Sequence, residues 1–513
     1  MPNPVTPARK ATLDKDLDKI VRMEEAAGHL SRRLAGPGFG LLFIAAAALF
    51  AAIYVSGETN GAFIIIAAML GGYMALNIGA NDVANNVGPA VGSKALSMVG
   101  ALLIAAVFES AGALIAGADV VGTISKGIID PSAIAEPKVF IWAMMAALIS
   151  SALWVNLATM LGAPVSTTHA VVGGVMGAGV AAAGISAVNW STMGSIAASW
   201  VISPVLGGVI GAAFLAFIKA KIIYKDDKIA AARRWVPVLL GVMSAAFIAY
   251  LAMKGLKQII QLGGFTIAMI GLASGLLTYV IAKPVIRRQS EGMENRNQSV
   301  RRLFNVPLIC SAALLSFAHG ANDVANAVGP LAAIVHTAEA GDVLSTVRIP
   351  FWVMMIGAAG ISFGLLLFGP RLVRMVGEQI TKLNPMRAYC VALSAAITVI
   401  VASWFGLPVS STHIAVGAVF GVGFFREWYT VKSKRRRDYM ARKYERRRSK
   451  PAMAGDVVEQ AATKAESSAP EEARRRMLVR RVHFTTIVAA WVVTVPAAAL
   501  LSGLIFLFLD KVF

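Results

Sequence analysis

The sequence predicts an all-α polytopic membrane protein of about 12–13 transmembrane helices, with two inverted repeats and broken helices at the midplane. Hydrophobic residues make up 57% of the 513 residues, whereas charged residues make up only 15%. The mean hydropathy of +0.68 indicates a chain whose solvent is largely the bilayer. Apolar runs of helix-spanning length alternate with charged loops, and one acidic motif occurs twice within the apolar runs. Together these observations predict the fold class.

The first part of the chain divides into three regions. Residues 1–37 carry both signs of charge and are expected to form a cytoplasmic amino-terminal segment. Residues 38–60 follow as an extra transmembrane helix, which has no small-residue cleavage site and is therefore expected to be retained. Residues 61–218 form the expected first inverted repeat, with apolar segments near 61–93, 97–117, 139–161, 164–184 and 193–218.

The second part divides into four regions. Residues 219–303 are expected to supply basic loops and two connecting helices, and residues 304–425 the second inverted repeat. Residues 426–482 are expected to form a basic cytoplasmic insertion, because they are rich in Lys and Arg and then in Ala, Glu and Ser. Residues 483–513 contain the last predicted transmembrane helix.

The positions of lysine and arginine predict the orientation. Basic residues gather at 219–234, 283–302 and 426–481, and such clusters are typical of cytoplasmic loops. If the amino terminus is cytoplasmic, the segment with Asp82 runs from outside to inside and the segment with Asp323 runs from inside to outside. The two repeats are therefore expected to be inverted. The net charge of +20 fits loops that face anionic lipid, and nucleic acid is not an expected partner.

The duplicated motif reads GANDVANNVGP from Gly79 to Pro89 and GANDVANAVGP from Gly320 to Pro330. Each copy places one Asp at membrane depth, Asp82 in the first and Asp323 in the second, separated by 323 − 82 = 241 positions. A carboxylate in the hydrocarbon core costs several kcal/mol, so both are expected to face a polar cavity. Glycine, Asn and Gly-Pro within the motif predict helix breaks that free backbone groups for a ligand.

Four asparagines accompany these carboxylates: Asn81, Asn85, Asn322 and Asn326. Spacings of three and four residues place Asp82 and Asn85, or Asp323 and Asn326, on one helix face. Carboxylate and amide oxygens suit a hard cation such as Na⁺, and the Asp side chains can alternatively carry a proton. The alternative for Asn85 and Asn326 is that their side chains satisfy backbone groups at a helix break.

A second pair of motifs is rich in hydroxyl groups. GAPVSTTH runs from Gly162 to His169 and GLPVSSTH from Gly406 to His413, and each resembles a helix start. A helix amino terminus with unpaired N–H donors suits a phosphate-like anion. The expected phosphate-binding residues are Asn81, Asp82, Ser166, Thr167, Thr168, Asn322, Asp323, Ser410, Ser411 and Thr412. The alternative is that Ser and Thr only hold helices together.

Glu109, in AAVFESAGALIAG, is the third acidic residue expected at membrane depth. It can relay protons, or it can accept hydrogen bonds as a neutral structural group, and the sequence leaves both roles open. His169 and His413 end the hydroxyl motifs and are expected to act as structural hydrogen-bonding partners.

The four motifs resemble the signature repeats of the inorganic phosphate transporter (PiT) family, over roughly Gly72 to Phe424. The resemblance implies a cation-coupled phosphate symporter with inverted repeats that forms a homodimer. It also implies functional roles for Asp82, Asp323 and Glu109. The chain departs from the family where many relatives have a second acidic or polar residue, because it has Ala392 there. A symmetric second acidic relay is therefore not expected.

The expected function is symport of inorganic phosphate with Na⁺ or H⁺ across the cell (inner) membrane, by alternating access. One alternative is a permease of the same fold for sulfate or another oxyanion. Another is a membrane-embedded phosphotransferase, although duplicated, inverted acidic motifs are not explained by catalysis. No catalytic residue and no cofactor beyond the coupling ion is expected. The expected partners are phosphate, a monovalent cation and the lipid bilayer.

Overall fold

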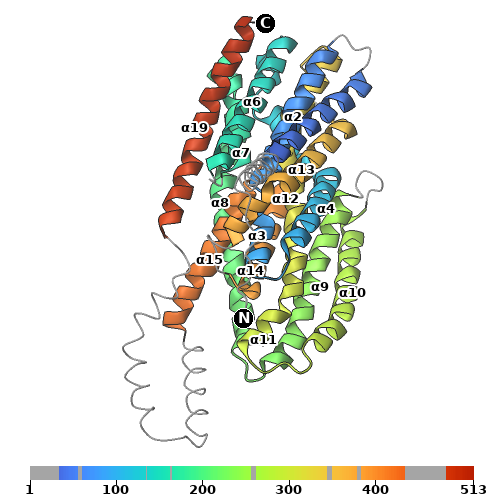
Figure 1. Cartoon of the computed structure of the whole chain (residues 1–513), viewed down its shortest axis with the longest axis vertical. Coiled ribbons are helices and arrows are strands. Elements are labelled where there is room, and N and C mark those ends of the chain that lie inside the picture. The colour runs from blue at the N-terminus through green and yellow to red at the C-terminus, as the bar shows by residue number, and fades with distance from the viewer. Residues whose placement is uncertain are drawn as a thin grey trace, which may run out of the picture.

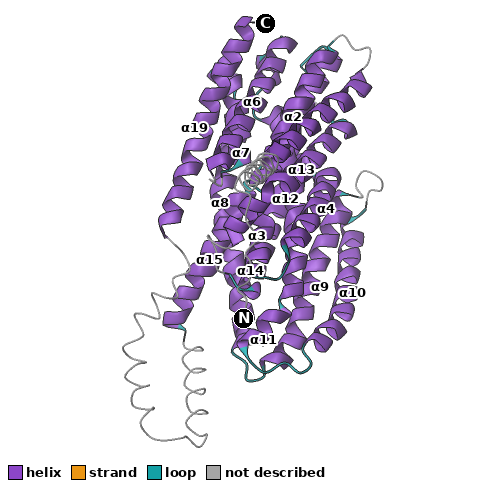
Figure 2. Cartoon of the chain, in the orientation of Figure 1, coloured by secondary structure: helices purple, strands orange, loops and turns teal. Residues whose placement is uncertain are grey.

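The computed structural model describes residues 34–55, 60–134, 136–161, 165–255, 262–343, 349–377, 383–433 and 481–512. Helices account for most of these residues, and no strand occurs among them (Figure 2). The expected segment 1–33 and most of the basic insertion, 434–480, lie outside the described residues. So do Gly162 to Pro164 at the start of the first hydroxyl motif.

The helices form one bundle, with α9 and α10 side by side along one edge and α19 along another (Figure 1). Eleven described helices are long and apolar enough to cross a membrane, and α7 is a shorter apolar helix. The prediction of an all-α polytopic membrane protein is confirmed. The helices are Leu34–Val55, α2 (Gly61–Asn81), α3 (Ala84–Gly92), α4 (Met98–Ala116), α5 (Ala118–Gly122), α6 (Pro137–Leu161), α7 (Thr167–Ala183), α8 (Trp190–Ile218), α9 (Lys228–Lys254), α10 (Gly264–Gln289), α11 (Asn297–Leu303), α12 (Asn305–Ala340), α13 (Phe351–Met375), α14 (Pro385–Trp404), α15 (Ser411–Lys432) and α19 (Arg481–Val512).

The two copies of the acidic motif differ in backbone structure. The first is interrupted as expected, because α2 ends at Asn81 and α3 begins at Ala84. The break expected in the second copy is absent, because α12 runs through the whole motif. The copies differ at one inner position, where the first has Asn86 and the second has Ala327. Alanine is the strongest helix former and asparagine a weak one, so the second copy favours a continuous helix.

The other interruptions lie at the hydroxyl motifs. Helix α6 ends before the first of these motifs, and α7 begins within it at Thr167. Helix α14 ends at Trp404, and α15 begins at Ser411. The expected helix starts are therefore confirmed. They bring two helix amino termini close to the acidic motifs at the centre of the bundle (Figure 1).

Helices α2 and α12, which carry the two acidic motifs, run antiparallel. The Asn60 side chain just before α2 donates to the carbonyl oxygen of Ala338 near the end of α12, at 3.1 Å. Farther along, Gly71 of α2 faces Leu331 of α12. Each helix also packs on a partner from the other half of the chain, α2 on α13 and α12 on α4. This matched packing is what inverted repeats predict.

Glycines in the acidic motifs allow these close approaches. A Cβ on Gly79 would lie 1.9 Å from the Ile361 carbonyl oxygen of α13, and a Cβ on Gly320 would lie 2.1 Å from the Glu109 carbonyl oxygen of α4. No side chain fits at either distance. The packing counterpart of Glu109 in the second half is therefore Ile361, whereas Ala392 lies on a different helix, α14.

The last helix belongs structurally with the first half. Helix α19 packs along α7 and α6, while α8 packs along α15 and α14. The boundaries expected from the sequence, which group α8 with the first repeat and leave the last helix separate, stay a prediction. The contacts are matched in sequence as well, because Gly173 and Gly177 of α7 face α19, and Gly417 and Gly421 of α15 face α8.

The basic segments meet at one end of the bundle. The Asn295 side chain donates to the backbone carbonyl of Asp226, joining the loop after α10 to the loop before α9. The rings of Tyr224 and Tyr429 stack with their centroids 5.8 Å apart, a separation typical of aromatic pairs. These contacts agree with the prediction that the basic clusters share one side of the membrane.

Candidate functional site

Asp82 occupies the turn between α2 and α3, and its side chain is only 2% exposed. The hydroxyl of Thr167 donates to one of its carboxylate oxygens at 2.6 Å. The hydroxyl of Thr412 donates to the other at 3.2 Å. Because Thr167 begins α7 and Thr412 lies in the first turn of α15, one carboxylate joins the two hydroxyl motifs.

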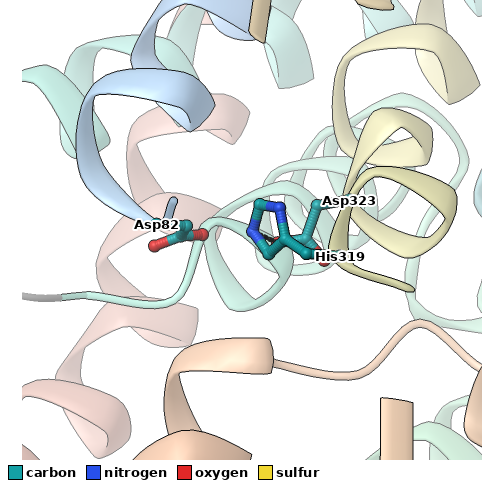
Figure 3. Close-up of side chains that lie close together, drawn as sticks. All are labelled: Asp82, His319 and Asp323. Atoms are coloured by element: carbon teal, nitrogen blue, oxygen red, sulfur yellow. Dashed lines mark ion pairs between the residues drawn. The ribbon is translucent and has the colours of Figure 1, made fainter. Parts of the chain in front are cut away.

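Asp323 lies on α12 close to Asp82 and is only 1% exposed. The hydroxyl of Ser411 lies 3.4 Å from its Oδ2, and the Nε2 atom of His319 lies 2.9 Å from the same oxygen. Asp82, His319 and Asp323 offer ligand atoms that all lie within 4.8 Å of one another. Figure 3 shows the two carboxylates on either side of the His319 ring.

The two outer asparagines connect the halves of the chain. The Asn85 amide donates to the hydroxyl of Thr412 at 2.9 Å. The Asn326 amide is shared between the hydroxyls of Thr167 and Thr168, at 3.2 Å from each. Each of these asparagines therefore reaches the hydroxyl motif of the opposite half. The structure brings together the carboxylates, amides and hydroxyls that the sequence predicted for a cation and an anion.

Two predicted amide donors point toward the helices that precede the hydroxyl motifs. The Asn81 amide donates to the hydroxyl of Thr159 on α6 at 2.8 Å. The Asn322 amide donates to Ser403 at 3.0 Å and to the carbonyl oxygen of Leu407 at 3.2 Å. In this arrangement both amides hold the helix ends in place, and their contribution to phosphate binding stays a prediction.

Ser166 and Ser410 cap the two helix starts. Each side chain accepts a hydrogen bond from the backbone N–H of the histidine three residues later, at 3.1 Å in α7 and 3.2 Å in α15. The hydroxyl oxygens are thus engaged in capping, as expected for serine before a helix. The rings of His169 and His413 lie 4.4 Å apart, so the two helix starts also contact each other through these histidines.

Glu109 is fully buried and belongs to a polar chain that the sequence only partly revealed. Its Oε1 accepts a hydrogen bond from the Asn86 amide at 2.8 Å, and its Oε2 lies 2.7 Å from Nδ1 of His319. The same ring contacts Asp323 through Nε2. His319 therefore bridges two buried carboxylates, and one of them belongs to the central site.

Sequence reasoning missed His319 and Asn86. His319 lies four residues before Asp323, a spacing that places the two on one helix face. The first repeat has Ile78 at the corresponding position, since 319 − 241 = 78. This difference between otherwise matched copies was the sequence signal that could have identified His319. A histidine at membrane depth in only one repeat indicates a functional or structural role.

Acceptor oxygens without donors line the centre of the site. Within the described residues, Oδ1 of Asp323 and Oδ1 of Asn326 are buried and have no hydrogen-bond partner. Buried oxygens without donors are costly unless a ligand or water satisfies them. A bound cation would satisfy the Asp323 carboxylate oxygen and the Asn326 amide oxygen. The amino termini of α7 and α15 meanwhile offer partial positive charge to an anion.

Comparisons with known proteins agree with the site and the fold. The model of a family described as "Phosphate transporter family" matches residues 78–502, which include all four motifs. A Helicobacter pylori (strain J99) protein named "Putative phosphate permease" is 47% identical over 97% of this chain and 100% of its own length. A Pyrococcus furiosus protein of the same description is 37% identical over 71% of this chain and 87% of its own length.

A solved structure titled "The sodium-dependent phosphate transporter" is similar in fold to this chain. It has a TM-score of 0.74 and 34% sequence identity, and the match covers 88% of this chain and 100% of that chain. The family match, the identity to these relatives and the eleven apolar helices lead to one conclusion. The chain is a multi-pass membrane protein that belongs to the phosphate transporter family.

Proposed function

We propose that this protein carries inorganic phosphate across the cell membrane together with Na⁺, by alternating access at the Asp82–Asp323 site. The observation that carries the proposal is the meeting of two buried carboxylates with two helix amino termini from opposite halves of the chain. The carboxylates suit a cation and the helix amino termini suit an anion, and the two sets of groups lie within hydrogen-bonding distance of each other. Family membership supports transport and argues against the phosphotransferase alternative.

The carboxylates favour phosphate over sulfate. At neutral pH phosphate carries at least one O–H group, which can donate to Asp82 or to the unpartnered Oδ1 of Asp323. Sulfate has no proton to donate, so its oxygens would face the same carboxylates without a hydrogen bond. Charge repulsion in a site of low dielectric constant would then oppose its binding.

Sodium is the proposed coupling ion. The related solved structure is titled as a sodium-dependent transporter. The donors gathered here are carboxylate, amide and hydroxyl oxygens, which hard cations prefer. Na⁺ between Asp82 and Asp323 would offset their repulsion and allow the phosphate anion to enter. Binding of cation and anion would thus be coupled through charge, which is the physical requirement of symport.

Alternating access is supported by the antiparallel packing of the two halves. The hydrogen bonds from Asn85 to Thr412 and from Asn326 to Thr167 cross between the halves at the site itself. Movement of one half against the other would expose the site to each side in turn. A homodimer remains a further prediction, tested by the mass of the purified protein in detergent.

Uptake of radiolabelled phosphate into proteoliposomes tests the proposal. An inward Na⁺ gradient is expected to drive accumulation, whereas an equal K⁺ gradient is not, and excess sulfate is expected to compete poorly. A proton gradient imposed without Na⁺ separates the two coupling ions. Accumulation driven by protons alone would contradict sodium coupling, and accumulation under none of these gradients would contradict phosphate transport.

A further inference from the structure

A cavity of about 570 Å³ lies between helix Leu34–Val55, α2, α6 and α13. Most of its lining is apolar. Four neutral residues with polar groups, Tyr73, Asn77, Asn156 and Thr159, nevertheless line it, and Arg371 is its one charged residue among those described. Polar side chains at membrane depth usually face water, a substrate pathway or each other. The lining therefore distinguishes this cavity from a simple packing defect.

The polar part of the cavity adjoins the central site. Thr159 accepts the hydrogen bond from the Asn81 amide at 2.8 Å, and Asn81 directly precedes Asp82. Beside it, the Asn156 amide donates to Oδ1 of Asn77 at 3.2 Å. The cavity thus ends one hydrogen-bonded pair away from the acidic motif. A displacement of α6 relative to α2 would break that pair and connect the cavity to the site.

Arg371 supplies the charge that an anion needs. It lies on α13, it is exposed, and it forms no ion pair with any described residue. A guanidinium is weakly hydrated and binds phosphate oxygens with two parallel N–H groups. At the rim of an apolar cavity its field is less screened than in open water, so it attracts anions and repels cations.

The corresponding place in the other half is closed. Gly112 of α4 and Gly364 of α13 make equivalent contacts, because a Cβ on Gly112 would meet the Phe317 carbonyl and a Cβ on Gly364 would meet the Leu76 carbonyl. Positions in α4 and α13 therefore correspond at an offset of 364 − 112 = 252. The counterpart of Arg371 is then Asp119, since 371 − 252 = 119. Asp119 is paired with Lys254 at the end of α9.

Aromatic side chains fill the space beside that ion pair. Tyr250 and Phe317 pack with Ala116 and Ala321 in a buried cluster, and the two rings lie edge to face at 6.5 Å. Helix Leu34–Val55 leaves the matching space near α2 open, because Pro37, Gly40 and Leu41 line the cavity there without filling it. The structure is therefore asymmetric about the site.

We propose that this cavity is the cytoplasmic vestibule of the phosphate pathway, and that Arg371 is the residue that attracts the anion into it. The inference rests on the proposed function for the identity of the anion. The cytoplasmic side is assigned because the cavity is lined from the start of helix Leu34–Val55, whose amino terminus is predicted to be cytoplasmic. The Asp119–Lys254 pair closes the equivalent route on the outer side.

Thiol accessibility tests the vestibule without requiring transport. With Cys310 and Cys390 replaced by alanine, Leu372→Cys places a thiol in the cavity lining. It is expected to react with membrane-impermeant methanethiosulfonates in inside-out vesicles and not in right-side-out vesicles. Val120 is the position in the first half that corresponds to Leu372, since 372 − 252 = 120, so Val120→Cys is the matched control. Val120 is 0% exposed and is expected to be unreactive in both.

The charge of Arg371 is tested by the ratio of labelling rates for an anionic and a cationic reagent at Leu372→Cys. About 1 kcal/mol between unit charges near 4 Å in water corresponds to about fivefold in rate. We expect Arg371→Gln to lower the anionic rate and raise the cationic rate by about that factor each, and so to lower the ratio roughly 25-fold. Arg371→Lys is expected to keep most of the ratio. Phosphate is expected to slow the anionic reagent, whereas chloride is not.

Several results would overturn the proposal. The first is labelling of Leu372→Cys from the outside, and the second is no labelling from either side in folded protein. The third is labelling by a lipid-soluble maleimide only, and the fourth is an unchanged ratio of anionic to cationic labelling rates in Arg371→Gln. The third result would indicate an acyl chain as the occupant. If phosphate uptake were absent but the sidedness and charge ratio held, the proposed function would fail while the anion-attracting vestibule stood.

Discussion

The buried bridge from Glu109 through His319 to Asp323 predicts a large and specific energetic coupling. All three side chains are 0% or 1% exposed, and the His319 ring lies 2.7 Å from one carboxylate and 2.9 Å from the other. Removing one partner of a buried charged pair typically costs about 3–5 kcal/mol, because the remaining charge is left without compensation. We therefore expect His319→Gln to lower the free energy of unfolding by about that amount.

A double-mutant cycle separates this coupling from general damage. Glu109→Gln keeps the side-chain shape, and it removes one of the two carboxylates that His319 compensates. In the Glu109→Gln background, His319→Gln is expected to cost about 1–3 kcal/mol less than in the wild type. Equilibrium unfolding in mixed micelles, titrated with SDS and followed by tryptophan fluorescence, measures each variant. His336→Gln, on the same helix and only half-buried, is the control and is expected to have a small effect.

Additive effects of His319→Gln and Glu109→Gln, within about 0.5 kcal/mol, would refute the bridge as an energetic unit. Phosphate uptake by the same variants then distinguishes a relay from a structural role. A structural bridge predicts that Glu109→Gln keeps the wild-type dependence of uptake on pH. Loss of that dependence in protein that reaches the membrane normally would assign a proton relay to Glu109.

Three further predictions follow from packing, hydrogen bonding and topology. Gly79→Ala should lower the free energy of unfolding by about 3 kcal/mol or more, because its Cβ would lie 1.9 Å from a carbonyl oxygen of α13. Gly194→Ala, whose Cβ would meet nothing within 4 Å, should be neutral or stabilising in the same unfolding assay. Thr412→Val removes the hydroxyl that donates to the Asp82 carboxylate. Loss of a hydrogen bond to a charged group costs about 1.5–3 kcal/mol, so phosphate binding measured by calorimetry should weaken roughly tenfold to 150-fold. Cysteines in the basic stretch 219–234 should react with impermeant reagents only from the inside and Ser132→Cys only from the outside; the reverse pattern would contradict the predicted orientation.

The acidic and hydroxyl motifs were predictable because their chemistry conflicts with their surroundings. A carboxylate inside an apolar run is costly, and its repetition after 241 positions excludes a chance occurrence. Serine followed by a Gly- and Val-rich run predicts a capped helix start, and both starts were found at Thr167 and Ser411. That these four segments meet at one site followed from the duplication.

Other features depended on tertiary contacts that the sequence does not display. The continuous course of α12 through the second motif reflects helix propensity and packing against α2, α4 and α14, which outweigh the Gly-Pro sequence near Pro330. The orientation of the Asn81 and Asn322 amides depends on where α6 and α14 end. The role of His319 depends on Glu109, which lies 210 positions away in the chain.

The pairing of helices between the halves was also beyond sequence reasoning. Apolar periodicity identifies each membrane segment but does not show which neighbour it contacts, because lipid and protein interior are similarly apolar. Glycines at matched positions of α7 and α15, such as Gly177 and Gly421, were the available signal. Each faces the backbone of a helix that the sequence had assigned to a different part of the fold.

The most direct test of the central claim is Na⁺-driven phosphate uptake by Asp82→Asn and Asp323→Asn, reconstituted beside the wild type at equal protein content. Loss of a buried charged partner typically costs about 2–5 kcal/mol or more, which is roughly thirtyfold to several thousandfold in affinity. We predict that each variant folds, as judged by size-exclusion chromatography, and that neither accumulates phosphate under the gradient. Wild-type accumulation by both variants would contradict a coupled cation–phosphate site at Asp82 and Asp323.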